Sequence, residues 1–204
     1  MQAVPWLIVI LLIAATTWLA WRAFFYEEYG DPVASAMLAF EKQNSLTVFS
    51  SRFEVVAESI DRRGVLNIDI LESRQASVIP ATVEYRVDLA RMDKDRFVWD
   101  AEANTLLVIL PPLKISRPNL DEGQARVFTE GTYVSRDASA DLARNNSQQA
   151  EKKAAAFARN PQILNLARNA AREAVRQNLT IPLQVAGHED IEIEVYFDGE
   201  ERPD

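Results

Sequence analysis

Cysteine is missing from this 204-residue sequence, and histidine occurs only once, as His188. The sequence therefore excludes disulfides, thiol nucleophiles and zinc sites that need cysteine or two histidines. Glycine is also scarce, with 6 residues, and neither a glycine-rich phosphate-binding motif nor the G-x-S-x-G nucleophile motif occurs. These absences argue against a nucleotide-binding loop and a serine hydrolase of that type, and no cofactor is expected.

Clustered positive charge is lacking as well, because 30 acidic residues outnumber 22 basic ones. Residues 189–204 hold eight acids and one base, a net −7, which leaves −1 of the total −8 for residues 1–188. Nucleic-acid binding depends on clustered Lys and Arg, so no nucleic-acid partner is expected. The acidic end is interpreted as a solvent-facing strand followed by an acidic tail at residues 199–204.

One long apolar run is present, and it begins after an N-terminal tail at residues 1–4. No charged residue occurs from Trp6 to Ala20, and aromatic residues gather at both ends of the apolar stretch. A helix of about 20 apolar residues spans the ~30 Å hydrocarbon layer of a bilayer. We therefore expect a transmembrane anchor over residues 5–26, with the lipid bilayer as its partner. The side chains expected to anchor it are Trp6, Leu12, Trp18, Trp21 and Phe25.

A cleaved signal peptide is the main alternative to this retained anchor. Signal peptides have a basic start and small residues at the cleavage site, whereas residues 1–5 hold no Lys or Arg and the corresponding zone is rich in Trp and Phe. The flanking charges nearly balance, since Arg22 is followed by Glu27 and Glu28. We expect a single-pass inner-membrane protein with a short N-terminal tail inside and the domain in the periplasm.

A single water-soluble domain is expected over residues 45–198, after a linker at residues 27–44. Asp31 and Pro32 are typical of a helix start, so the linker is predicted to hold a short helix that ends near Gln43. Alternating apolar residues predict strands in the segments that follow, although a helix within residues 47–58 stays open. A turn is predicted at 61–64, and the apolar run 105–110 predicts a central strand covered on both faces.

Two alanine-rich helices are predicted after these strands. The first is capped by Ser135 or Asp137 and runs to about residue 159, and the second runs from Pro161 to about residue 177. A half-buried strand at 191–197 ends the domain. This order predicts the α+β class, with a single mostly antiparallel sheet, a C-terminal helix pair and a final edge or closing strand. The residues expected to let the first helix approach its neighbour closely are Ala143, Ala150, Ala154 and Ala158.

Several short motifs resemble, in their order, a bacterial family of membrane-anchored proteins known as domain of unknown function 4230. They are R-V-D-L at 86–89, the strand at 105–110, L-P-P-L-K-I at 110–115, L-D at 120–121, the alanine-rich helix and the closing strand. The resemblance covers residues 46–197 and implies an anchor followed by an α+β domain. Arg86 replaces a frequent glycine and Leu113 a frequent proline, and neither departure affects the expected fold. The family implies no reaction and no ligand.

The acids matched by this resemblance are Asp88 and Asp121. Two carboxylates could bind a hard cation or perform acid–base chemistry, but Asp88 could equally end a strand and Asp121 cap a turn. Lys114 and Arg117 lie in a proline-rich loop that could bind an anion or a lipid head group, or simply face solvent. His188 beside two acids is a weak candidate metal ligand, and a loop histidine is the commoner reading.

Three arginines follow one another at a spacing of four, which places Arg168, Arg172 and Arg176 on one stripe of the second helix. This stripe could meet anionic lipid, the acidic strand face of Glu192 and Glu194 in the same chain or in a second copy, or only solvent.

The leading hypothesis is a membrane-tethered, non-enzymatic interaction or scaffold domain with an unidentified protein partner or self-association. Tethering raises the local concentration of such a domain at the membrane surface. A membrane-surface hydrolase or metal-dependent enzyme that uses Asp88, Asp121 or His188 is the second hypothesis, and a binder of anions or lipid head groups is the third.

Overall fold

The computed structural model describes residues 11–21, 31–41, 43–65, 68–130, 136–188 and 190–200. Residues 11–21 form an exposed helix, which carries Leu12, Trp18 and Trp21. None of the helices within these described ranges is both long and apolar enough to span a membrane. Trp6, Phe25 and both ends of the predicted anchor lie outside the described residues.

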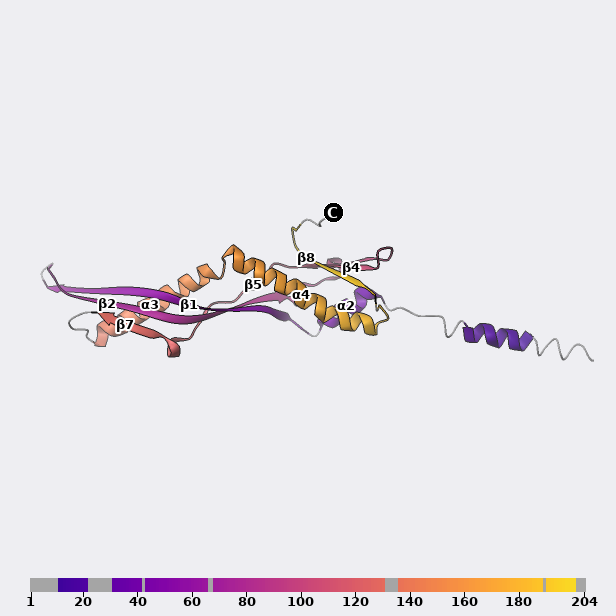
Figure 1. Cartoon of the computed structure of the whole chain (residues 1–204), viewed down its shortest axis with the longest axis horizontal. Coiled ribbons are helices and arrows are strands. Elements are labelled where there is room, and N and C mark those ends of the chain that lie inside the picture. The colour runs from indigo at the N-terminus through magenta and orange to yellow at the C-terminus, as the bar shows by residue number, and fades with distance from the viewer. Residues whose placement is uncertain are drawn as a thin grey trace, which may run out of the picture.

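The largest feature is a long antiparallel hairpin of strands β1 (Ser45–Val65) and β2 (Ile68–Asp88), which extends to one end of the molecule in Figure 1. Strand β1 continues without a break through residues 47–58 and 61–64. The alternative helix and the predicted turn are therefore both wrong. The register shifts between Arg63 and Gly64, so the strand accommodates this glycine as an irregularity instead of turning there, and a second shift lies between Thr47 and Phe49.

Three short strands complete the first sheet along β2. They are β5 (Lys114–Ile115), β6 (Asn119–Leu120) and β7 (Arg126–Glu130), and each pairs with β2 in antiparallel orientation. Strand β1 pairs with β2 alone, so one side of it is an edge of the sheet. Short 3₁₀ turns lie between these elements at Leu89–Arg91 (η1), Lys94–Arg96 (η2) and Glu122–Gln124 (η3).

A second, three-stranded sheet contains β3 (Phe97–Asp100), β4 (Thr105–Leu110) and β8 (Glu192–Phe197). The α+β class is confirmed, but the prediction of one sheet is wrong, because β3 and β4 pair with β8 instead of with the hairpin. Strand β4 is central, as predicted. Strand β8 is an edge strand and runs parallel to β4, a pairing that α3 and α4 make possible by carrying the chain back.

Three helices cover these sheets: α2 (Pro32–Glu41), α3 (Arg136–Phe157) and α4 (Pro161–Val185). The predicted cap of α2 is confirmed, since the Val33 N–H donates to Asp31 Oδ1 at 2.9 Å. Helix α4 runs eight residues beyond its predicted end and includes Pro182. Burial of Leu179 and Leu183 in these extra turns outweighs the helix-breaking effect of one proline near the helix end.

Helix α3 packs along the hairpin through small side chains. Its buried row recurs every fourth residue, so Leu142 is buried and Ala143 is exposed, contrary to the prediction for Ala143. Asn146 lies in the same row and is 1% exposed. Its side-chain amide donates to backbone or side-chain oxygens of Gln75 and Ser77 at 3.0–3.2 Å, and its Oδ1 accepts from the Ser59 hydroxyl at 2.7 Å.

The main core lies at the other end of the molecule, between α4, α2 and the three-stranded sheet. The row of buried residues along α4 consists of Ala167, Ala171, Val175, Leu179 and Leu183. Its last four members pack against the apolar face of β4 and β8, and this contact fixes which side of α4 turns toward β8.

Candidate functional site

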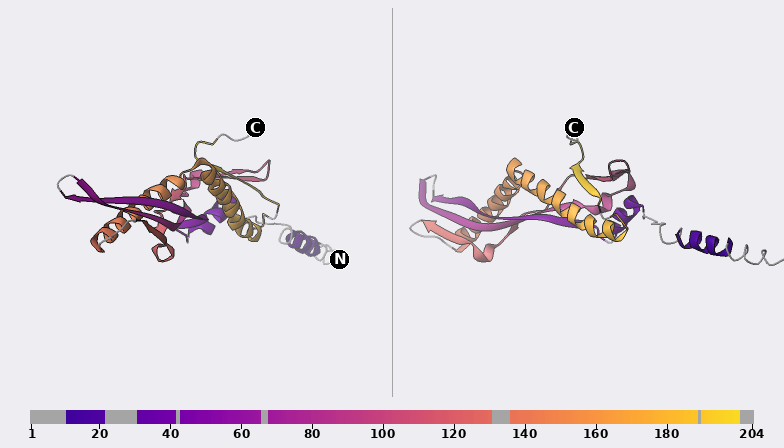
Figure 2. Two further views of the ribbon diagram at one scale, coloured as in Figure 1. Left: turned by 60° about the vertical axis from the view of Figure 1, so that its left-hand side comes forward. Right: turned by 45° about the vertical axis from the view of Figure 1, so that its right-hand side comes forward.

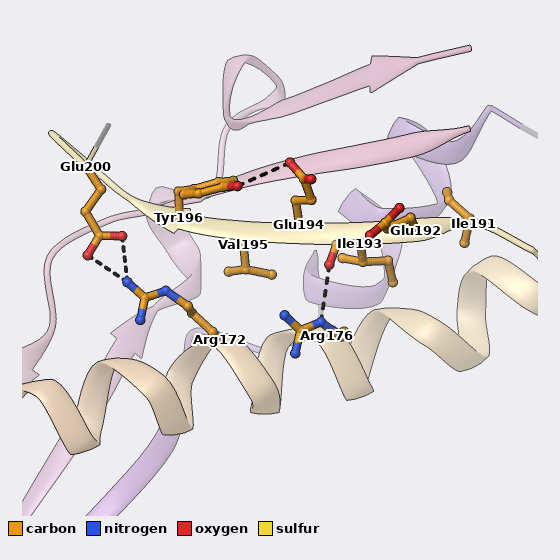
Figure 3. Close-up of a pocket in the computed structure, with 9 residues that line it drawn as sticks. All are labelled: Arg172, Arg176, Ile191, Glu192, Ile193, Glu194, Val195, Tyr196 and Glu200. Atoms are coloured by element: carbon orange, nitrogen blue, oxygen red, sulfur yellow. Dashed lines mark hydrogen bonds and ion pairs between the residues drawn. The ribbon is translucent and has the colours of Figure 1, made fainter. Parts of the chain in front are cut away.

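A groove with a volume of about 860 Å³ lies between α4 and the edge strand β8 (Figure 3). The N-terminus of α4 is stabilised, because Pro161 occupies the first helical position and the Gln162 N–H donates to the Asn160 side chain at 2.9 Å. The buried row of α4 faces the core, and the arginine stripe beside it therefore points along the edge of β8.

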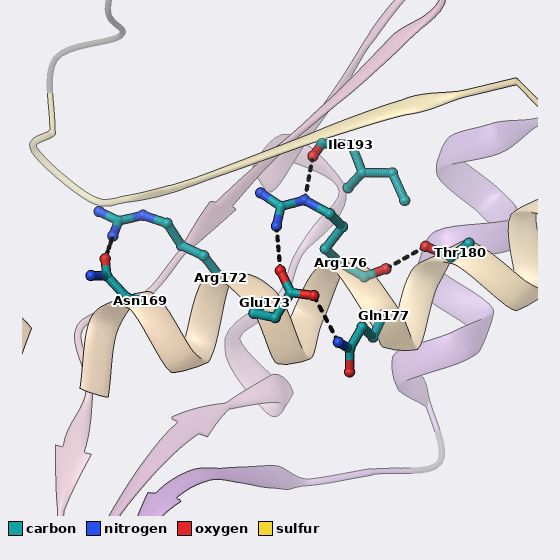
Figure 4. A network of polar contacts seen from close by, with 7 residues as sticks. All are labelled: Asn169, Arg172, Glu173, Arg176, Gln177, Thr180 and Ile193. Carbon is teal, nitrogen blue, oxygen red and sulfur yellow. Dashed lines mark hydrogen bonds and ion pairs between the residues drawn. The ribbon is translucent and has the colours of Figure 1, made fainter. Parts of the chain in front are cut away.

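Arg172 and Arg176 form one wall of this groove. Arg172 donates from Nη2 to both carboxylate oxygens of Glu200 at 2.7 and 2.8 Å, and from Nη1 to Asn169 at 2.7 Å. Arg176 donates from Nε to the backbone carbonyl of Ile193 at 3.2 Å and from Nη1 to Glu173 at 2.7 Å (Figure 4). The arginine stripe thus contacts the edge and the end of β8 in the same chain.

Glu200 is the anionic partner that sequence analysis missed, because it was assigned to an acidic tail. Burial alone would raise the pKa of this carboxyl group. The N–H of Phe197 donates to the Glu200 carboxylate, and Arg172 adds a hydrogen bond and a positive charge. Together these effects outweigh burial, so the pKa of Glu200 lies below its ordinary value. Arg168 and Arg172 also lie over the Phe197 ring, with guanidinium carbons 5.8 and 5.5 Å from its centroid.

The other wall of the groove is the free edge of β8. The N–H groups of Glu192 and Asp198 donate to carbonyls at either end of β4 at 3.0 Å. Since backbone groups alternate along a strand, those of Ile193 and Val195 point away from β4 and into the groove. Side chains alternate too, so Ile193, Val195 and Phe197 are buried while Glu192 and Glu194 point outward.

The two matched acids, Asp88 and Asp121, do not come together. Asp88 ends β2, whereas the Asp121 N–H donates to the carbonyl of Pro80, eight residues back along β2. The two acids are therefore separated by about 27 Å of strand. Asp121 is 3.8 Å from Arg52, and it precedes the turn η3, which contains Gly123, without a capping hydrogen bond from its side chain. The described residues contain no cluster of three or more His, Asp or Glu side chains that could hold a metal ion.

Asp88 pairs instead with Lys114, whose Nζ lies 2.5 Å from Asp88 Oδ2. The hydrogen bond from Lys114 lowers the pKa of Asp88, and the charge of Lys114 acts in the same direction against the opposing effect of burial. This ion pair joins the end of β2 to β5. Arg117 is exposed in the loop after β5 and forms no ion pair with the described residues.

The lone histidine, His188, follows α4 and donates its backbone N–H to Leu183 O at 2.9 Å, which helps to end the helix. Its ring is half-buried and lies 5.7 Å from the Trp99 ring. This contact places His188 against an aromatic surface, and Glu189, one of the two acids beside it, lies outside the described residues.

Neither a curated protein nor a solved structure matches this chain. A family model described as "Protein of unknown function (DUF4230)" matches residues 39–193, from α2 through the second residue of β8. The match covers most of the chain and includes the first sheet, β3, β4, both long helices and the groove residues Arg172 and Arg176, but only the first two residues of β8. The chain therefore belongs to the DUF4230 family.

Proposed function

We propose that this protein is a membrane-tethered, non-enzymatic interaction domain, and that it binds an extended segment of a partner protein at the free edge of β8. The observation that carries this proposal is the groove between β8 and α4, into which point the backbone groups of β8 that do not pair with β4. Edge strands recruit extended peptides because each new backbone hydrogen bond adds to a ladder that already exists.

Backbone geometry defines what such a segment would bond. Ile193 and Val195 each offer an N–H and a C=O on the groove side. The carbonyl of Ile193 already accepts from Arg176 at 3.2 Å, so an arriving strand would displace the Arg176 guanidinium from it. The long Arg176 side chain can then donate to a carbonyl of the bound segment, which keeps its N–H groups satisfied.

Charge indicates which segment would fit. Glu192 and Glu194 alternate with the buried residues of β8 and lie on its outward face. An added strand places its own alternate side chains beside them, so Lys or Arg at those positions would form cross-strand pairs. A second copy of β8 would bring glutamates beside glutamates, and like charges on paired strands are destabilising. These charges favour a basic segment from a different protein over self-association.

The other two functional hypotheses gain less support from this geometry. A mechanism with two carboxylates needs both within reach of one substrate atom, whereas Asp88 and Asp121 are separated by about 27 Å of strand. An anion site on the arginine stripe would compete with Glu200 and Glu173, which already bind Arg172 and Arg176.

A single substitution tests the strand edge without removing bonds to β4. Val195→Pro deletes only an N–H that points into the groove, and proline is tolerated on edge strands. Val195→Ala is the matched control, because it shortens the same side chain and keeps the N–H. Binding of a labelled peptide of alternating Lys and Val to the detergent-solubilised full chain would be measured by fluorescence anisotropy.

We expect the Lys-Val peptide to bind at least tenfold more tightly than a Glu-Val peptide of the same length, a difference of about 1.4 kcal/mol. Val195→Pro should weaken this binding by a similar factor, and Val195→Ala should leave it nearly unchanged. Equal binding of both peptides, or full binding by a folded Val195→Pro variant, would refute strand addition at β8.

A further inference from the structure

The end of the molecule formed by α2 and the last turns of α4 is poor in charged residues, although Asp31 caps α2 and Glu41 ends it. Residues 32–40 and 177–187, here called the charge-free end, contain no Asp, Glu, Lys or Arg among twenty residues, although 25% of the whole chain is charged. The two segments lie together, because α2 packs against α4. Solvent-facing helices ordinarily carry charged residues on their outer faces, so this surface is unusual within the chain.

Large apolar side chains project from this surface. Leu38 is 62% exposed, Ile181 68% and Val185 85%. Ile181 and Val185 are one helical turn apart on α4, on the side away from the buried Leu179 and Leu183. The outer face of the final turns of α4 therefore exposes large apolar side chains beside uncharged polar ones such as Gln184, and clustered exposed apolar residues often mark an interaction surface.

A hollow of about 500 Å³ adjoins the exposed face of α2. Its walls include Ala34, Met37 and Leu38 from α2, and Leu89 and Met92 from the segment after β2. All of its lining residues are uncharged, so an apolar chain could enter it without removing any charged group from water.

The position of this surface indicates what covers it. Asp31 directly precedes α2, so the chain enters the domain at the charge-free end (Figure 2). The apolar sequence from Trp6 to Ala20 lies only a few residues before this entry point. We infer that the charge-free end rests against the bilayer that holds the N-terminal segment, with Leu38, Ile181 and Val185 in the boundary between head groups and acyl chains. This inference rests on the proposed membrane tether.

Such a contact would orient the proposed binding groove. Val185 lies thirteen residues beyond Arg172 on α4, which is about 20 Å along the helix axis. The groove would therefore lie within about 20 Å of the lipid surface, while the hairpin of β1 and β2 extends toward the opposite end of the molecule. The contact is apolar, and the nearby β3–β4 turn carries Asp100 and Glu102, so anionic lipid should not strengthen it.

The absence of native cysteine allows an unambiguous test with single fluorescent labels on the full chain. Val185→Cys and Leu38→Cys report on the charge-free end, and Leu166→Cys is the control, because Leu166 is 55% exposed and lies near the start of the same helix. Each labelled protein would be reconstituted into phosphatidylcholine vesicles that contain a lipid with a nitroxide quencher below its head group.

We expect the nitroxide lipid to quench the labels at residues 185 and 38 several-fold more than the label at 166, and aqueous iodide to show the reverse order. Replacing Ile181 and Val185 with Asp should abolish the quenching at residue 38 while the tether remains, which separates lipid contact from mere proximity to an anchor. Salt and anionic lipid should leave the quenching unchanged.

Three results would overturn the inference in distinguishable ways. If alkaline carbonate removes the chain from the vesicles, the tether and the contact both fail. If the chain stays bound but all three labels are quenched only by iodide, the contact alone fails. If labels at residue 185 in two molecules transfer energy to each other and escape the nitroxide lipid, a second copy covers the surface instead of lipid.

Discussion

A single buried amide, Asn146, connects helix α3 to both strands of the hairpin. Replacing it with Ala leaves the polar groups of Gln75, Ser77 and Ser59 without their partner in a site where Asn146 is 1% exposed. We predict that Asn146→Ala lowers the free energy of unfolding by about 1–3 kcal/mol, the cost of unsatisfied buried polar groups. Chemical denaturation would measure this loss.

The neighbouring Asn145 supplies a control for this prediction, since it is exposed on the same helix. Asn145→Ala gains the same helix propensity, about 0.5 kcal/mol, and breaks no buried network. Equal stability of the two variants would show that the Asn146 hydrogen bonds contribute nothing to the fold.

Glu200 gives the protein a pH-dependent contact at the end of β8. Its pKa is lower in the folded chain than the ordinary value of about 4.3, so the ionised form stabilises the fold above that value. This contribution is lost as the pH falls through the folded pKa. We predict that Glu200→Gln lowers the free energy of unfolding by about 1 kcal/mol at pH 7 and that the difference from the unmodified chain disappears in strong acid.

Denaturation curves at a series of pH values would check this, because removing Glu200 should flatten the acid limb of the stability profile. The same substitution should free Arg172 without changing its bond to Asn169. A difference that persists unchanged from pH 7 down to pH 2 would show that packing, and not charge, accounts for the role of Glu200.

At the scale of elements, the free edge of β1 is covered by side chains of α3. Gln149 bonds both the N–H and the C=O of Glu58, at 2.9 and 3.2 Å, and Lys153 donates to the carbonyl of Val56 at 2.8 Å. Unpaired strand edges pair with other chains, and natural proteins block them in such ways. We predict that the double substitution Gln149→Ala and Lys153→Ala promotes self-association through β1.

The chain offers a matched control in Gln148 and Lys152, which are the same residue types on the exposed face of α3. Sedimentation at several concentrations would compare the two double variants. We expect oligomers only for the Gln149 and Lys153 variant, and identical monomer behaviour of both variants would contradict the role given to these side chains.

Sequence periodicity predicted the elements better than it predicted their pairing. Strands with one clearly dry face, such as residues 192–197, were found because alternation is a local property. The full length of β1 was not predicted. Val56 and Ile60 on its outer face are as apolar as Val55 on its inner face, so the alternation of apolar and polar residues is obscured. The pairing of β4 with β8 was not predicted either, because it joins segments more than eighty residues apart.

At the candidate site, too, the sequence predicted the local arrangement of residues but not the contact between distant segments. A spacing of four placed Arg168, Arg172 and Arg176 on one stripe, because helix geometry fixes that arrangement. The ion pair of Arg172 with Glu200 depends on a turn after β8, in which Gly199 has a φ of +79° and the Glu200 N–H donates to Phe197 O. The pair Asp198-Gly199 is a typical turn signal, but it does not indicate that the turn brings Glu200 back to Arg172.

At the scale of the whole molecule, the described residues form three hydrophobic cores, and the two largest differ in the size of their side chains. The core around α4 buries large side chains such as Leu106, Leu110 and Leu179, whereas the core beneath α3 contains Val55 and Ile79 with four alanines. Each large side chain fully removed from water contributes about 1.5–3 kcal/mol, and alanine contributes much less. The hairpin end should therefore open more readily than the end that holds the groove.

Native-state hydrogen exchange on the detergent-solubilised full chain would reveal this difference. We predict that amides paired between β1 and β2 near Val55 and Ile79 exchange through a partial opening at least about 1 kcal/mol below global unfolding. Amides of β4 and of the second half of α4 should exchange only through the global transition and show its full denaturant dependence. If amides at both ends exchanged with one common opening free energy, α3 would couple the hairpin to the main core as tightly as α4 couples β8. The packing of the alanines beneath α3 would then be stronger than its buried area implies.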